Sequence, residues 1–275
     1  MTRYFYGASH EEFSPDDLLR HVVAAERAGF DGISASDHLQ PWWEPGESGH
    51  AWVWLGAAGQ ATERIPLGTG VTASGARYHP ALIAQAWMTL ERLFPGRPFL
   101  GIGSGEALNE VPVGDDWPSA ADQIERLDET LGFIRRLWGG ETITEAGRFY
   151  RLKDCKLHTL ADRKPPIWVS AFGPQAAEVA GRWGDGLWTL PDPESTPEVI
   201  DAYREARRRA GHDGDGEQEM YEHGEREVGD EEFADNIVAG SDPQAIADEL
   251  RELEQLGGTV ITLQNNSAGN AARAI

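Results

Sequence analysis

The chain has 275 residues, 40% of them hydrophobic, and its 46 acidic side chains against 24 lysines and arginines give a formal net charge of −22. This charge repels nucleic acid and anionic membrane surfaces, so we expect neither as a partner, and no apolar run approaches the roughly 18 to 20 residues of a membrane span. The single cysteine, Cys155, excludes an internal disulfide and a cysteine-based metal site. With one cysteine we expect a protein of the reducing cytoplasm. We also expect a halophilic source, because a net charge of −22 repels itself and salt screens that repulsion.

Short apolar segments alternate with amphipathic helical patterns along the chain. A capped helix begins at Ser14-Pro15 and ends at Gly29, and residues 147–152 predict a small hairpin outside the main pattern. The remaining helices are predicted at 51–62, 79–93, 120–137, 174–181, 196–209 and 242–256. The predicted strands are 4–6, 32–35, 64–71, 97–103, 165–171, 186–190 and 258–263.

This alternation predicts an α/β fold of the (β/α)8 TIM barrel type, as one domain spanning residues 1–275. An eighth strand is needed to close such a barrel. Its place is near Glu217 to Val228, within an acidic and glycine-rich segment between His212 and Glu232 that supports a strand poorly. We therefore expect the region of strand seven to be shortened or missing, which would expose sheet edges.

In a barrel of this type, functional side chains lie at the carboxyl ends of the strands. Four polar or glycine-rich segments are predicted to meet there. They are Asp37-His38, Thr69-Gly70-Val71, Gly103 to Glu110, and Ser170 to Pro174. Their convergence is the strongest argument from the residues for an active site.

Asp37-His38 directly follows a predicted buried strand. The imidazole of His38 exchanges a proton near neutral pH, and Asp37 is a hydrogen-bond acceptor beside it. Trp42 and Trp43 offer flat apolar walls for a planar ligand. The alternative is that the Asp-His pair only caps the next helix.

Glu106 lies between a glycine and an apolar pair, where partial desolvation would suit a general acid. The alternative is a helix-start carboxylate interacting with the helix dipole. Gly103 and Gly105 permit close approach of the backbone to a ring, and Asn109 is placed to hydrogen-bond it. Gly173-Pro174 offers backbone amides to a phosphate, or is an ordinary turn.

The remaining histidines show no ligand spacing, so we expect no metal. These are His50, His79, His158, His212 and His223. Trp87, Trp138 and Trp183 fall on helical patterns and are predicted core residues.

Several longer strings resemble the luciferase-like superfamily, and within it the coenzyme F420 (deazaflavin)-dependent glucose-6-phosphate dehydrogenase subgroup. They are Ser36-Asp37-His38-Leu39-Gln40-Pro41-Trp42, Leu67-Gly68-Thr69-Gly70-Val71, Tyr78-His79-Pro80, Gly103-Ser104-Gly105-Glu106-Ala107-Leu108-Asn109-Glu110, Arg148 to Leu152 and Gly181 to Gly186. The resemblance covers about residues 4 to 210 and the last helix and strand.

The resemblance implies a barrel that binds coenzyme F420 at its carboxyl-end rim and forms a homodimer. The bond between Gly70 and Val71 would match the family's non-proline cis peptide behind the cofactor ring. The residues that would contact the cofactor are Asp37, Gly70, Val71, Ser104, Gly105, Asn109, Ala171, Phe172, Gly173 and Pro174. By the same resemblance His38 is the base that takes the substrate's hydroxyl proton, Glu106 the proton donor, and Trp42 a shield for developing charge.

Three departures from the subgroup bear on the substrate and on phosphate binding. The subgroup grips a sugar phosphate with basic residues in its second half, whereas this chain has no lysine after Lys164. Pro191-Asp192-Pro193-Glu194 stands where a basic loop is expected, and Phe172 stands where relatives tend to be small.

We therefore expect an F420-dependent oxidoreductase that transfers a hydride between a small alcohol or hemiacetal and the deazaflavin. An FMN-dependent monooxygenase is the first alternative, against which the string from Glu106 to Glu110 argues. The second is a shortened, non-catalytic flavin or deazaflavin binding protein, which the segment from His212 to Glu232 favours.

Overall fold

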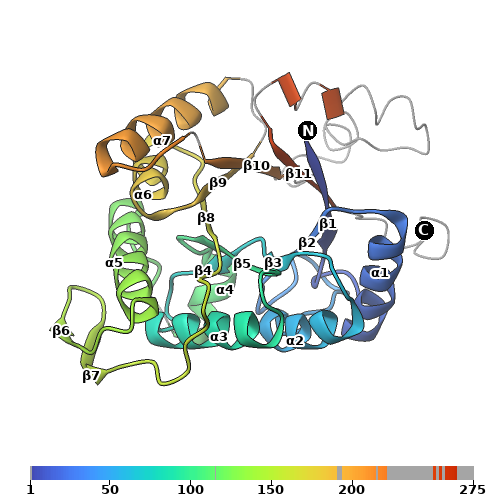
Figure 1. Ribbon diagram of the computed structural model, residues 1–275, viewed down its shortest axis with the longest axis horizontal. Coiled ribbons are helices and arrows are strands. Elements are labelled where there is room, and N and C mark those ends of the chain that lie inside the picture. The colour runs from blue at the N-terminus through green and yellow to red at the C-terminus, as the bar shows by residue number, and fades with distance from the viewer. Residues whose placement is uncertain are drawn as a thin grey trace.

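The computed structural model describes residues 2–114, 116–190, 194–214, 216–221, 250–251, 254–255 and 258–264. Within these ranges a ring of parallel strands is surrounded by helices, as the view along the ring in Figure 1 shows. No helix in this part of the chain is long and apolar enough to cross a membrane.

The predicted (β/α)8 barrel is confirmed. Eight of the described strands form the ring, and all of their pairings are parallel. The ring closes because its third strand (Leu67–Thr69) pairs with its fourth (Pro98–Gly103), and its last strand (Val260–Gln264) pairs with its first (Arg3–Ala8). In order around the ring the strands are β1 (Arg3–Ala8), β2 (Gly32–Ala35), β3 (Leu67–Thr69), β5 (Pro98–Gly103), β8 (Ile167–Ser170), β9 (Gly186–Thr189), β10 (Glu217–Tyr221) and β11 (Val260–Gln264).

The strand expected to be shortened or missing is β10, which lies between β9 and β11. It has five residues, and its Glu219 pairs with Trp188 of β9 on one side and with Val260 of β11 on the other. The strand is therefore present and is longer than β2, β3, β8 and β9, and the expectation of open sheet edges at this place is wrong. The predicted helix at 242–256 and the residues 191–193 fall largely outside the described residues.

Helices connect the strands around the outside of the ring (Figure 1). Ser14 caps α1 (Pro15–Ala28) by accepting a hydrogen bond from Asp17 N, and Gly29 ends it with φ 97°, as the sequence predicts. The other long helices are α2 (Ala51–Ala61), α3 (Pro80–Leu93), α5 (Ala120–Trp138), α6 (Pro174–Trp183) and α7 (Thr196–Ala210). The predicted hairpin is present as the antiparallel pair β6 (Ile143–Ala146) and β7 (Arg151–Cys155).

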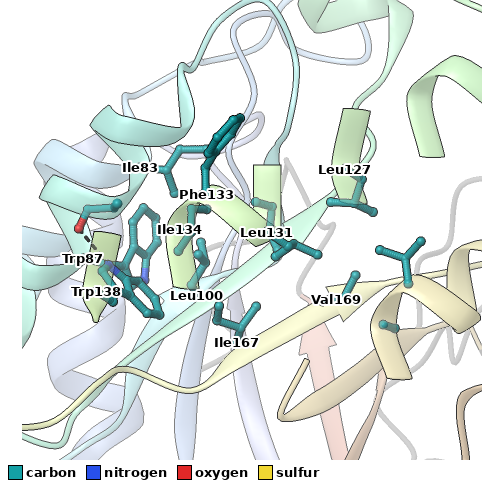
Figure 2. Packing of buried hydrophobic residues seen from close by; sticks show 14 of the residues in the cluster. Ile83, Trp87, Leu100, Leu127, Leu131, Phe133, Ile134, Trp138, Ile167 and Val169 are labelled. Atoms are coloured by element: carbon teal, nitrogen blue, oxygen red, sulfur yellow. Dashed lines mark hydrogen bonds between the residues drawn. The ribbon is translucent and has the colours of Figure 1, made fainter. Parts of the chain in front are cut away.

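The largest apolar cluster fills the space between strands β5 and β8 and helices α3 and α5 (Figure 2). Trp87 and Trp138 are buried in it as predicted, and each indole satisfies its N–H by donating to a carbonyl oxygen, of Phe99 and Ala84 respectively. Trp183 packs at the edge of the cluster and donates to Asp128. This cluster packs against β5 and β8 and so holds their carboxyl ends in place.

Short elements follow two of the strand ends. β4 (Thr72–Ala73) follows β3 and pairs with the end of β5. The one-turn helix α4 (Ala107–Glu110) and the 3-10 helix η1 (Val111–Val113) follow β5. These segments, with the loops after β1 and β2, surround the carboxyl-end opening of the barrel.

Candidate active site

A cavity of about 210 Å³ opens at the carboxyl ends of the strands. All four segments predicted to meet there contribute to its walls, and a fifth, the loop after β1, contributes Glu11. The lining consists of Glu11, Ser36, Asp37, His38, Trp42, Gly70, Val71, Ala73, Arg77, Gly103, Ser104, Gly105, Glu106, Asn109, Ser170, Phe172, Trp188 and Leu190.

His38 lies between two carboxylates at this cavity. Its Nδ1 is 3.0 Å from Oε1 of Glu11, and its Nε2 is 3.7 Å from Oε2 of Glu106. The His38 side chain is 13% exposed, that of Glu11 is 3% exposed, and that of Glu106 is 46% exposed. His38 is therefore fixed from behind by a buried carboxylate and faces a more accessible one.

The same contacts shift the protonation of the pair. Burial alone would lower the pKa of His38, but the hydrogen bond and negative charge of Glu11 outweigh it, and the pKa is raised. Glu106 and Asp37 add to this effect. Burial alone would raise the pKa of Glu11, yet His38 and a hydrogen bond from Ser36 lower it to about 2. Glu11 thus stays ionised behind the imidazole.

Glu11 was not predicted from the sequence to be a site residue. Ser36 Oγ donates to Glu11 Oε2 at 2.6 Å, and Ser9 Oγ donates to the same atom at 3.1 Å, so both neighbours orient the carboxylate. The signal was available: Ser9-His10-Glu11 is a polar cluster directly after the first strand, just as Asp37-His38 follows the second.

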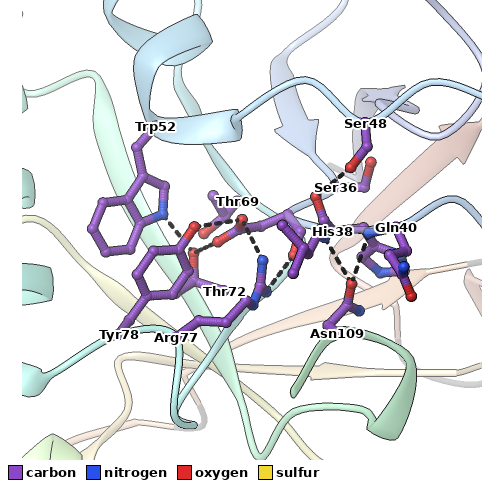
Figure 3. Close-up of polar contacts among 12 residues, drawn as sticks. Ser36, His38, Gln40, Ser48, Trp52, Thr69, Thr72, Arg77, Tyr78 and Asn109 are labelled. Carbon is purple, nitrogen blue, oxygen red and sulfur yellow. Dashed lines mark hydrogen bonds and ion pairs between the residues drawn. The ribbon is translucent and has the colours of Figure 1, made fainter. Parts of the chain in front are cut away.

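Asp37 was predicted to contact the cofactor ring. It lines the cavity, but its carboxylate is buried and engaged by other side chains. Thr72 Oγ1 donates to Oδ2 at 2.7 Å and Tyr78 OH donates to Oδ1 at 3.0 Å, while Trp52 Nε1 donates to Thr72 in turn (Figure 3). The carboxylate therefore anchors the loop that carries His38.

Asn109 was expected to hydrogen-bond a bound ring, and it is also committed to the protein. Its Oδ1 accepts hydrogen bonds from the backbone N–H groups of Leu39 at 2.7 Å and Gln40 at 3.4 Å (Figure 3). Its Nδ2 donates to Glu106 Oε2 at 3.4 Å. Asn109 therefore joins the loop of His38 to the helix that begins at Glu106.

Part of the cavity lining is built from glycine backbone. The peptide bond between Gly70 and Val71 is cis, as the resemblance implied. A Cβ on Gly70 would approach Ser34 Oγ to 2.1 Å, and one on Gly103 would approach Val71 Cγ2 to 3.0 Å. Gly105 has φ 96°, which side chains rarely adopt. Glycine at these positions therefore permits the close packing of neighbouring segments at the cavity and, at Gly105, the positive φ.

The segment predicted to hold a phosphate follows β8. Phe172 lines the cavity, is 58% exposed, and lies 6.1 Å from the ring of Trp188. Ala171 is buried, and its N–H donates to Trp188 O. Gly173 is the N-terminal cap residue of α6, followed by Pro174 at the first helical position. Ser104 also lines the cavity. The ring centroids of Trp42 and His38 are 5.0 Å apart.

Within the described ranges, no group of three or more His, Cys, Asp or Glu side chains is placed to hold a metal ion.

Comparison with known families and structures matches this geometry. Residues 2–221 match the family model described as luciferase-like monooxygenase. The F420-dependent glucose-6-phosphate dehydrogenase of Microbacterium testaceum is 44% identical over 213 residues, 76% of this chain and 63% of the relative. The F420-dependent hydroxymycolic acid dehydrogenase of Mycobacterium tuberculosis is 43% identical over 206 residues, 74% of this chain and 57% of the relative. The chain thus spans about three fifths of these relatives' length.

Among solved structures, an F420-dependent secondary alcohol dehydrogenase in complex with an F420-acetone adduct superposes with a TM-score of 0.90 at 29% identity. The match covers 96% of this chain and 93% of that one. A coenzyme F420-dependent tetrahydromethanopterin reductase from Methanopyrus kandleri shares the fold, with a TM-score of 0.78 at 16% identity.

Proposed function

The chain belongs to the luciferase-like monooxygenase family, and from this premise we propose that it is an F420-dependent oxidoreductase. It transfers a hydride between the deazaflavin and a small alcohol or hemiacetal. The observation that carries the proposal is the position of His38, which is held by Glu11 on one side and faces Glu106 and the cavity on the other.

His38 acts as the general base of this reaction. A proton on Nδ1 that is donated to Glu11 leaves Nε2 with a lone pair directed to the cavity side, where it takes the proton of a substrate hydroxyl. Glu11 stabilises the imidazolium that results, because its carboxylate remains ionised. Glu106 supplies the proton that accompanies reduction of the deazaflavin. Trp42 limits the access of water to His38.

The flat ring of a deazaflavin would lie against the part of the cavity lining that Gly70, Gly103 and Gly105 form, since these residues present backbone and no side chain there. Val71 and Ser104 complete this part of the lining, with Asp37 and Asn109 holding the loops around it. The backbone from Ala171 to Pro174 is the place for the cofactor's phosphate, because α6 begins there. Bound F420 would accept and return a hydride at its ring.

The charges around the cavity favour a neutral substrate. Its described lining includes three carboxylates, of Glu11, Asp37 and Glu106, and besides His38 one cationic side chain, Arg77. Arg77 is already paired with Asp37. A sugar phosphate would meet net negative charge here, whereas an alcohol or hemiacetal needs only the base and an apolar wall.

The test is to titrate the purified protein with F420 in high salt and to follow deazaflavin absorbance while alcohols, sugars and sugar phosphates are added. We expect tight binding of F420 and its reduction by neutral alcohols. Preferential binding of FMN with oxygen-dependent turnover would instead identify a monooxygenase. Binding of F420 without turnover by any substrate class would identify a non-catalytic binding protein. The presence of β10 counts against that last outcome, because the barrel wall is closed where a gap was expected.

The proposal also includes one domain and a homodimer. Pairing of β1 with β11 supports a single domain, since it joins segments more than 250 residues apart. The outer faces of α2 and α3 support the dimer. Helix α2 has no charged residue, and Val53, Leu82 and Leu93 are 74%, 53% and 61% exposed, on a chain with 46 acids. Light scattering tests the dimer. We expect wild type to be a dimer and Ala57→Arg, which places a charge on the exposed face of α2, to be a monomer.

A halophilic, cytoplasmic setting completes the proposal. The net charge of −22 and the single cysteine support it. Thermal unfolding in low and high KCl tests the salt requirement, and we expect the melting temperature to rise with salt.

A further inference from the structure

The two groups assigned to proton transfer lie on separate loops. His38 follows β2, while Glu106 follows β5 and precedes α4. Their separation of 3.7 Å between Nε2 and Oε2 therefore depends on what connects the two loops. Arg77, from a third loop between β4 and α3, contacts both.

On one side Arg77 holds the loop of His38. Its Nη2 donates to the backbone oxygen of Asp37 at 2.7 Å, and its Nη1 donates to Asp37 Oδ1 at 3.4 Å. Asp37 is the residue directly before His38, so these contacts fix the backbone from which the imidazole projects. Figure 3 shows Arg77 reaching toward this loop beside Tyr78 and Thr72.

On the other side Arg77 holds the end of α4. Its side-chain Nε donates to Glu110 Oε1 and its backbone N donates to Glu110 Oε2, both at 3.1 Å. Because Glu106 caps the same one-turn helix, fixing Glu110 fixes the start of the helix as well. Gly75 makes room for this contact, since a Cβ there would approach Glu110 Oε2 to 2.1 Å.

Burial makes the arrangement obligatory. The side chain of Arg77 is 7% exposed, and those of Asp37 and Glu110 are each 1% exposed. Charged groups this deeply buried are tolerated only when they are paired and hydrogen-bonded, and here one guanidinium serves two carboxylates. Although Arg77 lines the cavity, its donors are directed to the protein and not to a substrate anion.

We propose that Arg77 is a positioning residue that, through Asp37 and Glu110, sets the distance between His38 and Glu106. This inference rests on the proposed oxidoreductase function. Asn109 makes a parallel connection by joining Leu39 to the same helix, so loss of the Arg77 bridge displaces the two groups without releasing the loops completely. The consequence is a loss of turnover with little loss of binding.

The first experiment compares Glu110→Gln with Asp185→Asn. Asp185 is a control for the contacts, because its carboxylate also accepts from an arginine, Arg135 at 2.8 Å, and from a backbone N–H, that of Ile167. It is more exposed than Glu110, at 49%, and because it precedes β9 it lies at the opposite end of the barrel. For Glu110→Gln we expect kcat to fall about 10-fold to 100-fold, as misplacement near 1 Å does. We expect KM and the F420 dissociation constant to stay within about 3-fold.

The second experiment compares Arg77→Lys with Arg77→Met. Lysine keeps the positive charge but lacks the planar fork needed to reach both loops. We expect kcat of Arg77→Lys between those of wild type and Arg77→Met. Arg77→Met leaves two carboxylates buried without a cation, so its folding is checked by circular dichroism; if it does not fold, the comparison rests on Arg77→Lys and Glu110→Gln.

Three results overturn the proposal. One is a kcat of Glu110→Gln within 2-fold of wild type. Another is an equal loss in Asp185→Asn, which would indicate general destabilisation. The third is wild-type kcat in Arg77→Lys. If wild type itself neither binds nor reduces F420, the proposed function fails instead, and the two failures are told apart by the wild-type control.

Discussion

The two halves of the barrel opening differ in what they offer a ligand. The half formed after β1 to β5 carries Glu11, His38 and Glu106, each held by further polar contacts. The half formed after β8 and β9 contributes Ser170, Phe172, Trp188 and Leu190 to the described lining, and none of these carries a charge. Within the described lining the ionisable side chains are therefore concentrated in one half, and the described residues of the other half provide uncharged surface.

Because of this difference, substitutions should have different effects in the two halves. Buried ionisable groups must be paired, so each change in the first half leaves a partner unsatisfied. The apolar side chains of the second half contact neighbours without such constraints, and Phe172 remains 58% exposed. We expect substitutions in the first half to lower turnover and substitutions in the second half to alter ligand preference.

The largest expected effect is that of His38→Ala. Removal of the base should lower kcat by about 10²-fold to 10⁴-fold, the usual contribution of general acid–base catalysis. Binding of F420 should change little, because the proposed role of His38 is proton transfer and the cofactor contacts are assigned to other residues. Stopped-flow measurement of deazaflavin absorbance gives both quantities. The control is His158→Ala, at an exposed histidine away from the cavity; unchanged kcat in His38→Ala would refute the assigned role.

The next effect is that of Glu11→Gln. Glu11 raises the pKa of His38, so its neutralisation lowers that pKa. A base is active when deprotonated, and the acidic limb of the pH profile of kcat/KM should therefore move to lower pH. The maximal rate should fall about 10-fold, since the imidazolium loses its partner. Glu91→Gln serves as control, because Glu91 is equally buried but accepts from Gly96 N near the other end of β5. A shift to higher pH would contradict the prediction.

The contrast between the halves also shows what could be predicted from the sequence. The strand ends and Asp37, His38 and Glu106 were predictable, because strand and helix periodicity places them at one rim. Glu11 could have been placed at the rim from its position after the first strand. Its contact with His38 could not be predicted, and neither could those of Arg77 and Glu110, since contacts between loops far apart in sequence depend on side-chain directions that periodicity does not determine. The same limit applies to Asp37 and Asn109, which reach the rim as predicted yet hydrogen-bond protein groups there.

Strand β10 illustrates a different limit. Its residues support a strand poorly on their own, but β9 and β11 present parallel edges on both sides. Tertiary context overrides weak local propensity when both neighbours offer backbone hydrogen bonds.

Acid sensitivity should arise mainly in the first half, and His10→Leu tests this. His10 is fully buried, and burial lowers its pKa to about 4 from 6.5. Its folded-state pKa lies below its unfolded-state value, so the unfolded chain binds more protons and stability falls as pH drops from 6.5 towards 4. Between pH 7 and pH 5 this costs about 2 kcal/mol. Urea unfolding at both pH values should show that loss in wild type and a smaller loss in His10→Leu; equal losses would exclude His10 as the source.

The smallest expected effect belongs to the second half. Phe172 packs against Trp188 at 6.1 Å but is mostly exposed, so Phe172→Ala removes surface without leaving a buried charge or cavity. We expect kcat within about 3-fold of wild type, because no proton-transfer group is touched. Relative kcat/KM values for bulky and small alcohols should shift towards the bulky ones, since the opening widens. Leu160→Ala, at an exposed apolar residue away from the cavity, should leave both unchanged. A loss of kcat as large as that of Glu11→Gln would show that the second half takes part in the chemistry, and the division of roles between the halves would then be wrong.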